Sequence, residues 1–514
     1  MKKVMIGLAC VALLLAAPHT SFAQYFQSLF DNDSTIDWGL CLYNKPDSNY
    51  FVVAWSQKGV QLSLFDMTIS ADGQNQLGKN DITISGKRLY IGDAGQMRHL
   101  SGGGYILPFN EQWPNPSTGY LHSSAGLLKL NEAGGTVFLK TYTDTSIYFD
   151  SFGDVSVMPD KGYLLCGSHS LNTPSNYPAY IIRTDSMGDT VWTHTYQKDT
   201  AEPATIFTID TLGGGRILAG AGSEHTEWDG SISYLGYSVW FMVLDGMGNV
   251  IKDTVYGSKY GGGGQIFNDI NGGYFHFGEI DTFETSDPSD YNNFPDYFAH
   301  LDTNFHIQWI TRFPYDYALG HRYIFKAIAL HDGNYLVEGD AGTYTFGYIL
   351  AWAAKVSKNG DIMWSNYYLS DSMHNSYFRD VVEMPNGNLV FTGAAFNDTI
   401  PAWREVQDMW LVGTDSNGCV TDGCLTTRVP TSPSLSYGEL TVYPNPATRM
   451  LNFQYSLLNN VRIKLIDVTG RVMDEQALQN SSTASFNVSR YTPGIYLYQF
   501  ITDSGVQSGK VIVE

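Results

Sequence analysis

The sequence contains few basic residues and no second long apolar run. Its 514 residues include 30 Lys and Arg against 51 Asp and Glu, which gives a net charge of −21. A surface this acidic repels phosphate backbones, so we expect no nucleic-acid partner. Beyond residue 23, no stretch is apolar and long enough to cross a membrane as a helix, so we expect no transmembrane segment in the mature protein.

Standard catalytic and metal-binding motifs are also missing. The sequence has no HExxH, no GxSxG and no Cys2His2 pattern, and the glycine-rich run 258–264 lacks the GK[ST] ending of a P-loop. The acidic run 281–290 has the composition of a Ca²⁺ site without EF-hand spacing. His225, His321 and Arg322 are isolated acid or base candidates. We therefore expect no cofactor, with Ca²⁺ as the one alternative, and no metal ligands or catalytic residues are assigned.

Residues 1–23 have the pattern of a secretory signal peptide. Lys2 and Lys3 precede an apolar run from Val4 to Ala17, and "SFA" stands before Gln24. This order predicts export across the inner membrane and cleavage after Ala23. Cys10 lies within the apolar run and lacks the usual upstream leucine, which argues against a lipoprotein.

A repeated unit recurs at nearly even spacing along most of the remaining chain. Each unit has a short apolar strand such as "GYLLCG", an alternating strand such as "AYIIRTD", a turn such as "DSMG", and a strand often opened by an aromatic. A further strand precedes each of these sets. The anchors of the seven units are Tyr50, Tyr105, Tyr163, Arg216, Tyr274, Tyr335 and Leu389. Seven units of four antiparallel strands predict an all-β, seven-bladed β-propeller at residues 24–425.

Two local features support the propeller. Asp185 and Gly188 in "DSMG" suit a hairpin turn, because Asp caps its own turn and Gly takes a positive φ. The seventh unit lacks a clear fourth strand, and the mature chain opens with an unattached strand in "QYFQSLFDND". We expect this strand to complete the last blade and close the ring.

Four of the five cysteines lie outside the signal segment. Cys419 and Cys424 are close in sequence, so an oxidising exported context favours a local disulfide between them. Cys41 and Cys166 fall in non-adjacent repeats, whereas a disulfide needs Cα atoms within about 7 Å. We expect this second pair to be buried free thiols, with a bridge as the alternative.

Residues 426–514 break the repeat. Residues 426–438 are rich in Pro, Ser and Thr and are predicted to be a linker. Residues 439–514 alternate apolar and polar residues between turns, which predicts a compact β-sandwich. The most distinctive stretches are "YPNPA" at Tyr443 to Ala447, "IKLIDVTGRVM" at Ile463 to Met473, "TPGIYLYQF" at Thr492 to Phe500 and the terminal "GKVIVE".

These motifs and their terminal position resemble the type A C-terminal sorting domain of the type IX secretion system. The resemblance implies an Ig-like sandwich recognised by the outer-membrane export machinery, usually cleaved, with the cargo then secreted or attached to the cell surface. The motif residues are Tyr443, Pro444, Asn445, Pro446, Asp467, Gly470, Gly494, Tyr496 and Lys510.

The links between predicted strands are unequal. We letter the four strands of each unit a to d in chain order. The a–b and c–d links are tight turns, whereas the b–c and d–a links are long and rich in aromatics and carboxylates. In an up-and-down blade the b–c and d–a links share one face, so one face carries the elaborate links. Trp113, Trp228, Tyr291 and Trp403 are the ligand-binding candidates there, because exposed rings stack on sugars. The alternative is that these rings pack within their own links.

Three functions are compatible with this pattern. The first is an exported, non-enzymatic propeller that binds a glycan or a protein at this face. The second is a glycoside hydrolase or lyase using carboxylates there, from Glu227, Asp229, Asp287 and Asp290. The third is a spacer without a ligand. We take binding as the leading hypothesis.

Overall fold

The computed structural model describes the chain in segments. These are residues 25–32, 36–92, 96–114, 121–142, 149–170, 177–198, 203–228, 233–258, 265–269, 271–278, 296–313, 322–342, 349–370, 375–396, 407–420, 440–467, 472–502 and 505–513. Within them the fold is all-β, with a single 3₁₀ turn at Gly213–Gly215. None of these segments contains a helix with the length and hydrophobicity of a membrane span.

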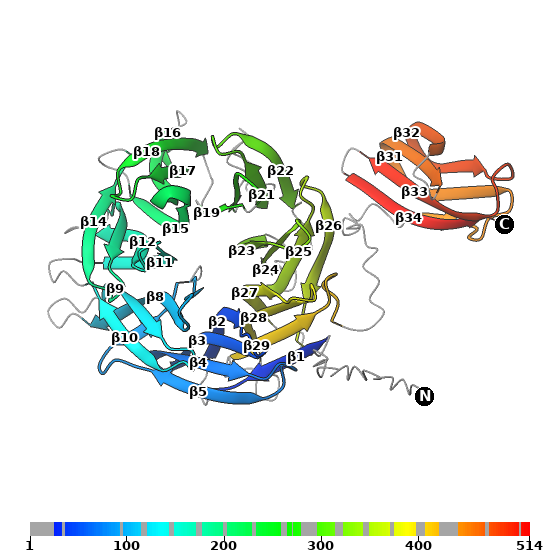
Figure 1. Ribbon diagram of the computed structural model, residues 1–514. Coiled ribbons are helices and arrows are strands. Elements are labelled where there is room, and N and C mark those ends of the chain that lie inside the picture. Colours follow the sequence, from blue (N-terminus) through cyan, green and yellow to red (C-terminus); the bar gives the residue numbers. More distant parts are fainter. Residues whose placement is uncertain are drawn as a thin grey trace, which may run out of the picture.

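Most strands belong to sheets arranged as a ring (Figure 1). One eight-stranded sheet has the order β27-β28-β29-β2-β3-β4-β5, with β1 paired to β29. Its strands are β1 (Phe26–Phe30), β2 (Ile36–Asn44), β3 (Tyr50–Lys58), β4 (Gln61–Ile69), β5 (Gln76–Ile82), β27 (Ser376–Glu383), β28 (Leu389–Phe396) and β29 (Gln407–Thr414). This sheet therefore joins the first and last repeats.

A nine-stranded sheet follows it around the ring, with the order β14-β13-β12-β11-β9-β8-β6 and with β10 and β7 paired to β9 and β8. Its strands are β6 (Arg88–Tyr90), β7 (Arg98–His99), β8 (Tyr105–Pro114), β9 (Leu121–Leu130), β10 (Thr136–Thr141), β11 (Phe149–Val157), β12 (Tyr163–Ser170), β13 (Ala179–Thr184) and β14 (Thr190–Tyr196).

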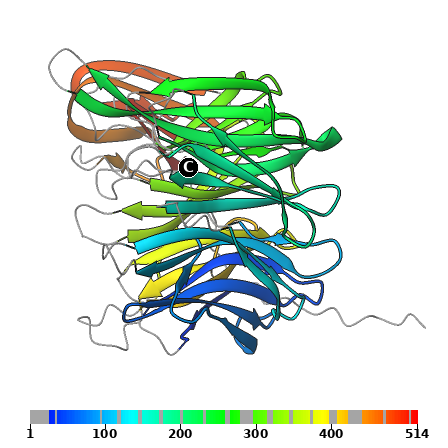
Figure 2. The same ribbon diagram turned by 90° about the vertical axis from the view of Figure 1, so that its left-hand side faces the viewer.

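Three four-stranded sheets complete the ring, each with its strands in sequence order. They contain β15 (Ala204–Leu212), β16 (Arg216–Trp228), β17 (Ser233–Leu244) and β18 (Val250–Ser258); β19 (Gln265–Asn268), β20 (Tyr274–Gly278), β21 (Asp296–Leu301) and β22 (Ile307–Phe313); and β23 (Arg322–Ala329), β24 (Tyr335–Gly342), β25 (Ile349–Val356) and β26 (Ile362–Tyr368). Figure 2 shows the ring edge-on, with strands running between its two faces.

The N-terminal strand closes the ring, as predicted. β1 pairs antiparallel with β29, from Phe26 opposite Gly413 to Phe30 opposite Met409. Phe26 is buried, and its ring covers Gly73 so closely that a Cβ there would lie 2.3 Å from it. The two ends of the repeat region are thus held by backbone hydrogen bonds and by one buried aromatic ring.

The "DSMG" element is the predicted hairpin turn. The Asp185 carboxylate accepts hydrogen bonds from the backbone N–H groups of Met187 (2.8 Å) and Asp189 (2.9 Å), and Gly188 has φ +80°. Equivalent carboxylates cap later turns in the same way, at Asp245, Asp302 and Asp415. Each of these turns has a local structural role.

The same turns also join neighbouring repeats. A hydroxyl group on the outer strand of one repeat donates to a carbonyl oxygen in the turn of the next. The pairs are Tyr142 to Gly188 (3.0 Å), Tyr196 to Gly248 (2.8 Å), Tyr256 to Phe305, Thr311 to Gly360 (2.5 Å) and Tyr368 to Gly418 (3.0 Å). The outside of the ring is therefore held by one repeated contact.

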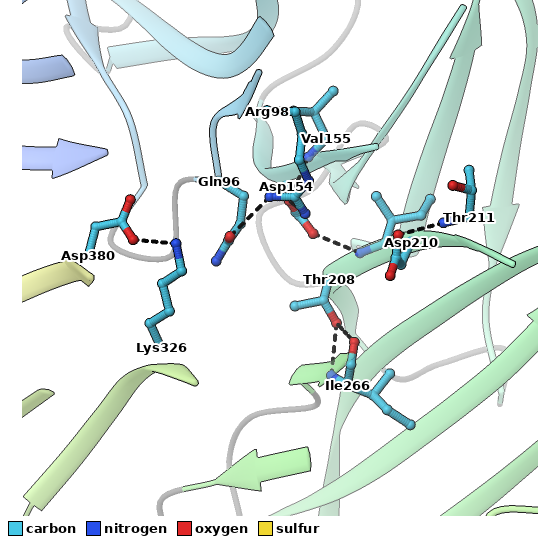
Figure 3. Close-up of polar contacts among 11 residues, drawn as sticks. Gln96, Arg98, Asp154, Val155, Thr208, Asp210, Thr211, Ile266, Lys326 and Asp380 are labelled. Carbon is cyan, nitrogen blue, oxygen red and sulfur yellow. Dashed lines mark hydrogen bonds and ion pairs between the residues drawn. The ribbon is translucent and has the colours of Figure 1, made fainter. Parts of the chain in front are cut away.

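The strands nearest the centre carry a repeated β-bulge. The bulge residues are Leu40, Gly153, Phe207, Phe325 and Arg379. In three repeats the following side chain accepts a hydrogen bond from a backbone N–H of the next repeat: Asp154 from Ile209 (2.9 Å), Thr208 from Ile266 (2.9 Å) and Asp380 from Leu42 (2.7 Å). Figure 3 shows the first two of these residues with the polar groups around them. The bulge thus serves to join repeats around the axis.

One long predicted link is instead a β-hairpin. β16 and β17 remain paired out to Trp228 opposite Ser233, so most of the expected link 222–238 is strand. The sequence does indicate a hairpin here, because Asp229-Gly230 is a hairpin-turn dipeptide between alternating segments. Trp113 likewise lies within β8 rather than in a loop.

The C-terminal residues form a separate five-stranded sheet. It contains β30 (Thr441–Tyr443), β31 (Met450–Asp467), β32 (Val472–Asn487), β33 (Gly494–Thr502) and β34 (Gly505–Val513), in the order β30-β31-β33-β34 with β32 paired to β31. Buried apolar side chains from these strands and their connections form its core, among them Phe453, Ile463, Phe486 and Val511. Its described strands pair with one another and with none of the described strands of the ring.

The cysteines agree with the sequence where they are described. Cys41 and Cys166 are buried free thiols, as predicted. Burial raises the pKa of the Cys41 thiol to about 12, so this group is not a reactive thiolate. Cys419 is buried, whereas Cys424 lies outside the described residues, and the disulfide between them stays a prediction.

Candidate functional site

The predicted binding face corresponds to one set of strand ends. Because paired strands are antiparallel, the b–c and d–a links leave from the ends of β3 and β8 and from the starts of β2, β27 and β29. Of the four predicted aromatics, Trp113 lies at this end of β8, and Trp228 lies at the end of β16 with only its backbone described. Tyr291 and Trp403 lie outside the described residues.

Trp113 contacts His122 and Lys87, and these three residues together with Glu111, which pairs with Lys87, form the Trp113 patch. The His122 ring stacks on the indole with centroids 5.7 Å apart, and the Lys87 ammonium lies 4.5 Å from the indole centroid. Lys87 also forms a 2.5 Å ion pair with the buried Glu111 carboxylate. The indole is partly exposed, so it both packs locally and presents ring surface at this end of the strand.

A second aromatic group lies where the ring closes. We call it the seam patch and define it as Trp38, Trp55, Phe325, Tyr377 and Arg379. The Trp38 ring stacks with Trp55 (5.6 Å) and with Tyr377 (4.9 Å), and its Nε1–H donates to the Gln407 side chain. Trp38 and Trp55 are partly exposed. The patch therefore combines side chains from the first repeat with side chains from the last two.

Arg379 is the charged centre of the seam patch. Its guanidinium carbon lies 4.0 Å from the Phe325 ring centroid, 4.8 Å from that of Trp38 and 5.4 Å from that of Tyr377. Its Nη1 donates to Asp340 (2.8 Å) and to the carbonyl of Phe378 (2.6 Å). The side chain is 5% exposed, so a buried cation is held by rings on its faces and a carboxylate at its edge.

The composition of the long links does not predict the seam patch, because its residues lie within strands. The available signal was a departure from the repeat. At the bulge position, the other described repeats have Leu40, Gly153, Phe207 and Phe325, and Arg379 alone among these five is charged. Aligned repeats therefore pointed to Arg379, although they gave no information on which rings surround it.

Beneath Arg379 lies a buried ionisable cluster on β23, β24 and β27. Lys326 pairs with Asp380, and Arg379 pairs with Asp340. Glu338 is fully buried, and neither of its oxygens has a hydrogen-bond partner among the described residues. Burial, and next the charge of Asp380, raise the pKa of the Glu338 carboxyl well above its ordinary value. Burial therefore favours the neutral form of this carboxyl and keeps it from contact with a substrate.

The opposite side of the axis has a simpler ion pair. Arg98 lies 3.1 Å from Asp154, whose carboxylate also accepts from the backbone of Val155 and Ile209 (Figure 3). Burial raises the pKa of Asp154 to about 6 despite the nearby guanidinium. Its contacts are to the backbone and to Arg98, which is the pattern of a structural carboxylate.

Three carboxylates lie together at the seam. One oxygen each of Asp31, Asp37 and Asp408 falls within 4.8 Å of the others, and Asp37 and Asp408 are buried. Oxygen ligands of this kind suit Ca²⁺ or Mg²⁺. Acidic groups also gather without an ion, so geometry alone does not assign a metal. The earlier Ca²⁺ candidate, 281–290, lies outside the described residues.

The other predicted acids and bases are placed only in part. Asp229, Asp287, Asp290 and His321 lie outside the described residues, and Glu227 and His225 are described only as backbone of β16. Arg322 begins β23, where its Nε lies 3.1 Å from the Tyr367 hydroxyl and its guanidinium faces the Trp352 ring. Arg322 is therefore packed against aromatic residues, and the predicted carboxylate pair stays a prediction.

The predicted sorting motif ties the last strand to the start of its sheet. Asn445 donates to the carbonyl of Lys510 (3.2 Å) and accepts from the N–H of Ile512 (2.9 Å). Ala447 also donates to the carbonyl of Ile512. Tyr496 lies opposite Asp467 and donates to the carbonyl of Thr492 (2.9 Å). Tyr443 is exposed, whereas Gly470 lies outside the described residues.

Comparison with solved structures finds partial likeness to other chains at low identity. An ulvan lyase of a new polysaccharide lyase family is 9% identical, with a TM-score of 0.45, over 74% of this chain and 96% of that one. A variant of the Synechocystis apocarotenoid oxygenase is 12% identical, with a TM-score of 0.39, over 66% and 74%. An endo-arabinase from Bacteroides thetaiotaomicron is 12% identical, with a TM-score of 0.31, over 48% and 90%.

Comparison with protein families gives a match for the C-terminal sheet. No curated protein matches the sequence. Residues 441–514 match the family described as the secretion system C-terminal sorting domain, and the match contains the whole β30–β34 sheet together with the described motif residues. The C-terminal part of this chain is a type IX secretion system C-terminal sorting domain.

Proposed function

We propose that this protein is an exported seven-bladed β-propeller that binds a carbohydrate through the face from which the b–c and d–a links leave. The sorting domain indicates an exported protein, secreted or held at the cell surface. The seven sequence repeats support seven blades, as does dividing the eight-stranded sheet into β2–β5 and β27–β29 with β1. In this proposal the sorting domain is an Ig-like sandwich that contacts the secretion machinery, and residues 1–23 are the signal peptide of the chain.

The observation that carries the binding function is the set of partly exposed indoles at these strand ends. Trp38, Trp55 and Trp113 all lie there, each fixed by stacking or by a cation. Rigid rings with apolar faces stack on pyranose rings at low cost in side-chain entropy. Glu338 and Asp340, two carboxylates of the buried cluster, do not form an exposed pair for hydrolysis, because both are buried.

A combined binding and release assay tests this function. The full purified protein is screened against a glycan array and in pulldowns with insoluble polysaccharides, and reducing-end release is followed in the same samples. We expect binding without release, with Trp113→Ala weakening binding about tenfold or more through loss of one stacked ring. Release of reducing ends establishes an enzyme instead. If the protein binds neither the array glycans nor the insoluble polysaccharides, the proposal is contradicted and a protein ligand or a spacer is favoured.

A further inference from the structure

The seam patch and the neighbouring strand β24 depart from the repeat at one position each. Arg379 replaces the uncharged residue found at the other described bulges. Glu338 lies opposite the residue that follows a bulge, where other repeats have Val53, Cys166, Gly220 and Thr392. Burying charge costs free energy unless it is paired. The same structural position is filled elsewhere without charge, so the fold alone does not require Arg379.

What Arg379 adds is a planar cation among three rings. Its guanidinium contacts Phe325 of β23, Tyr377 of β27 and Trp38 of β2, which belong to three different repeats. Asp340 and the Phe378 carbonyl hold its edge at 2.8 and 2.6 Å. A guanidinium fixed at its edge fixes the rings stacked on it, so Arg379 determines where Trp38, and through it Trp55, lie.

From these contacts, and resting on the proposed function, we infer that the seam patch is a subsite for neutral saccharides, in which Trp38 and Trp55 contact the sugar and Arg379 is the positioning residue. A ring platform assembled from three repeats is more rigid than a ring on one link. The sugar is recognised by its apolar face rather than by charge.

Charge around the patch supports a neutral ligand. Arg379 of the patch is already paired with Asp340, and Lys326, which follows Phe325, is paired with Asp380. Asp37 precedes Trp38, and Asp408 follows Gln407, which accepts from the Trp38 indole. With a net charge of −21 in addition, a uronate or sulfate group would be repelled at this site.

The position of the patch adds a second consequence. Trp38 and Trp55 come from the first repeat, and Phe325 and Tyr377 come from the last two. Trp38 is held in place across the seam by Tyr377 and Arg379, so the platform exists only in the closed ring, and a ligand that binds it stabilises closure by mass action. Ligand binding should therefore raise the unfolding temperature in proportion to the logarithm of ligand concentration.

The experiment measures affinity and unfolding temperature on the full protein with neutral polysaccharides (laminarin, xyloglucan) and acidic ones (alginate, polygalacturonate). We expect neutral binding that changes less than about twofold between roughly 50 and 500 mM salt, unlike charge-driven binding. Trp38→Ala should weaken it about thirtyfold and Arg379→Lys about tenfold, because Lys keeps the charge but not the planar stack. Trp192→Ala, on the outer strand β14, is the matched control with unchanged affinity.

Further readouts separate a positioning role from a merely structural one. Arg379→Lys should keep the unfolding temperature of the free protein while losing the ligand-induced rise and the change in indole fluorescence on binding. Trp55→Phe serves where Trp38→Ala does not fold. Preference for acidic polysaccharides, or neutral binding lost in Trp113→Ala but kept in Trp38→Ala, overturns this inference and leaves the proposed function. Binding to none of the four overturns both.

Discussion

Neighbouring repeats are joined in two ways, one on the outside of the ring and one around its axis. On the outside, a hydroxyl group of one repeat donates to a turn carbonyl of the next, with little change from repeat to repeat. Around the axis, the corresponding contacts use Asp154, Thr208 and Asp380, or the Arg379 cluster. Uniform contacts specify the fold, whereas the positions that vary are free to carry function.

Removing the closing strand should have the largest effect on the free energy of unfolding. A variant lacking β1, residues 25–32, loses the β29 pairing and the buried Phe26 ring. We expect the loss of at least about 4 kcal/mol of unfolding free energy, because a core side chain and a whole strand pairing go together. Denaturant unfolding measures it. The exposed Gln27→Ala change is the control, and an equal loss there would contradict a role for closure.

The outer contacts can be broken at a single glycine. A Cβ at Gly248 would lie 2.6 Å from His194 and 3.0 Å from Trp192, whereas Gly333 has a similar φ (+79° against +85°) with nothing within 4 Å. Gly248→Ala should cost about 3 kcal/mol, from backbone strain plus overpacking. Gly333→Ala should cost about 1 to 2 kcal/mol from strain alone. Equal losses in thermal unfolding would show that the turn does not dock on the preceding repeat.

The buried carboxyl of Glu338, among the inner contacts, should make the free energy of unfolding depend on pH. Burial raises the pKa of Glu338 above its ordinary value of 4.5, so its contribution to stability is complete below that pH and is lost as pH rises toward the folded pKa. Glu338→Gln should therefore lose less stability than the parent as the pH rises above about 5, by up to about 1.4 kcal/mol per pH unit until the carboxyl ionises in the folded protein. Parallel pH profiles for both proteins would refute this.

The smallest effect is expected for an ion pair between repeats on the surface. Lys140 lies 2.5 Å from Asp189, with side chains 32% and 72% exposed. Solvent screens such a pair, so a double-mutant cycle should give no more than about 0.5 kcal/mol, and less at high salt. A coupling several times larger would mean that surface charge, and not the hydroxyl-to-carbonyl contact, joins these repeats.

Repetition explains how much of the fold was predictable. The strands, the Asp185–Gly188 turn and the pairing of the N-terminal strand follow from local patterns that recur, and the structure confirms them. The sequence predicts a long link where the structure has the β16/β17 hairpin, because polar residues such as Glu224 and Thr226 are typical of loops. Strand pairing outweighed that composition.

The candidate site was less predictable for the same reason. Trp113 was identified from its place beside a long link, and it does lie at the expected end of its strand. Trp38 is far in sequence from Phe325 and Tyr377, and only ring closure brings the three side chains together. No local sequence pattern predicts that these three side chains lie together. The sequence gives one indication, because Arg379 is charged where the other described repeats have uncharged residues.

Closure by β1 has a consequence for how the chain folds. Phe26, in the first described strand, pairs with Gly413, in the last strand of the ring. Contacts of such sequence separation carry the loop-closure entropy of nearly the whole chain and form slowly. Each repeat can form from local contacts as it is synthesised, whereas the seam and its aromatic patch must wait for the last strand. β29 ends at Thr414 and the sorting domain matches residues 441–514, so the ring can close before the domain that directs export has been synthesised.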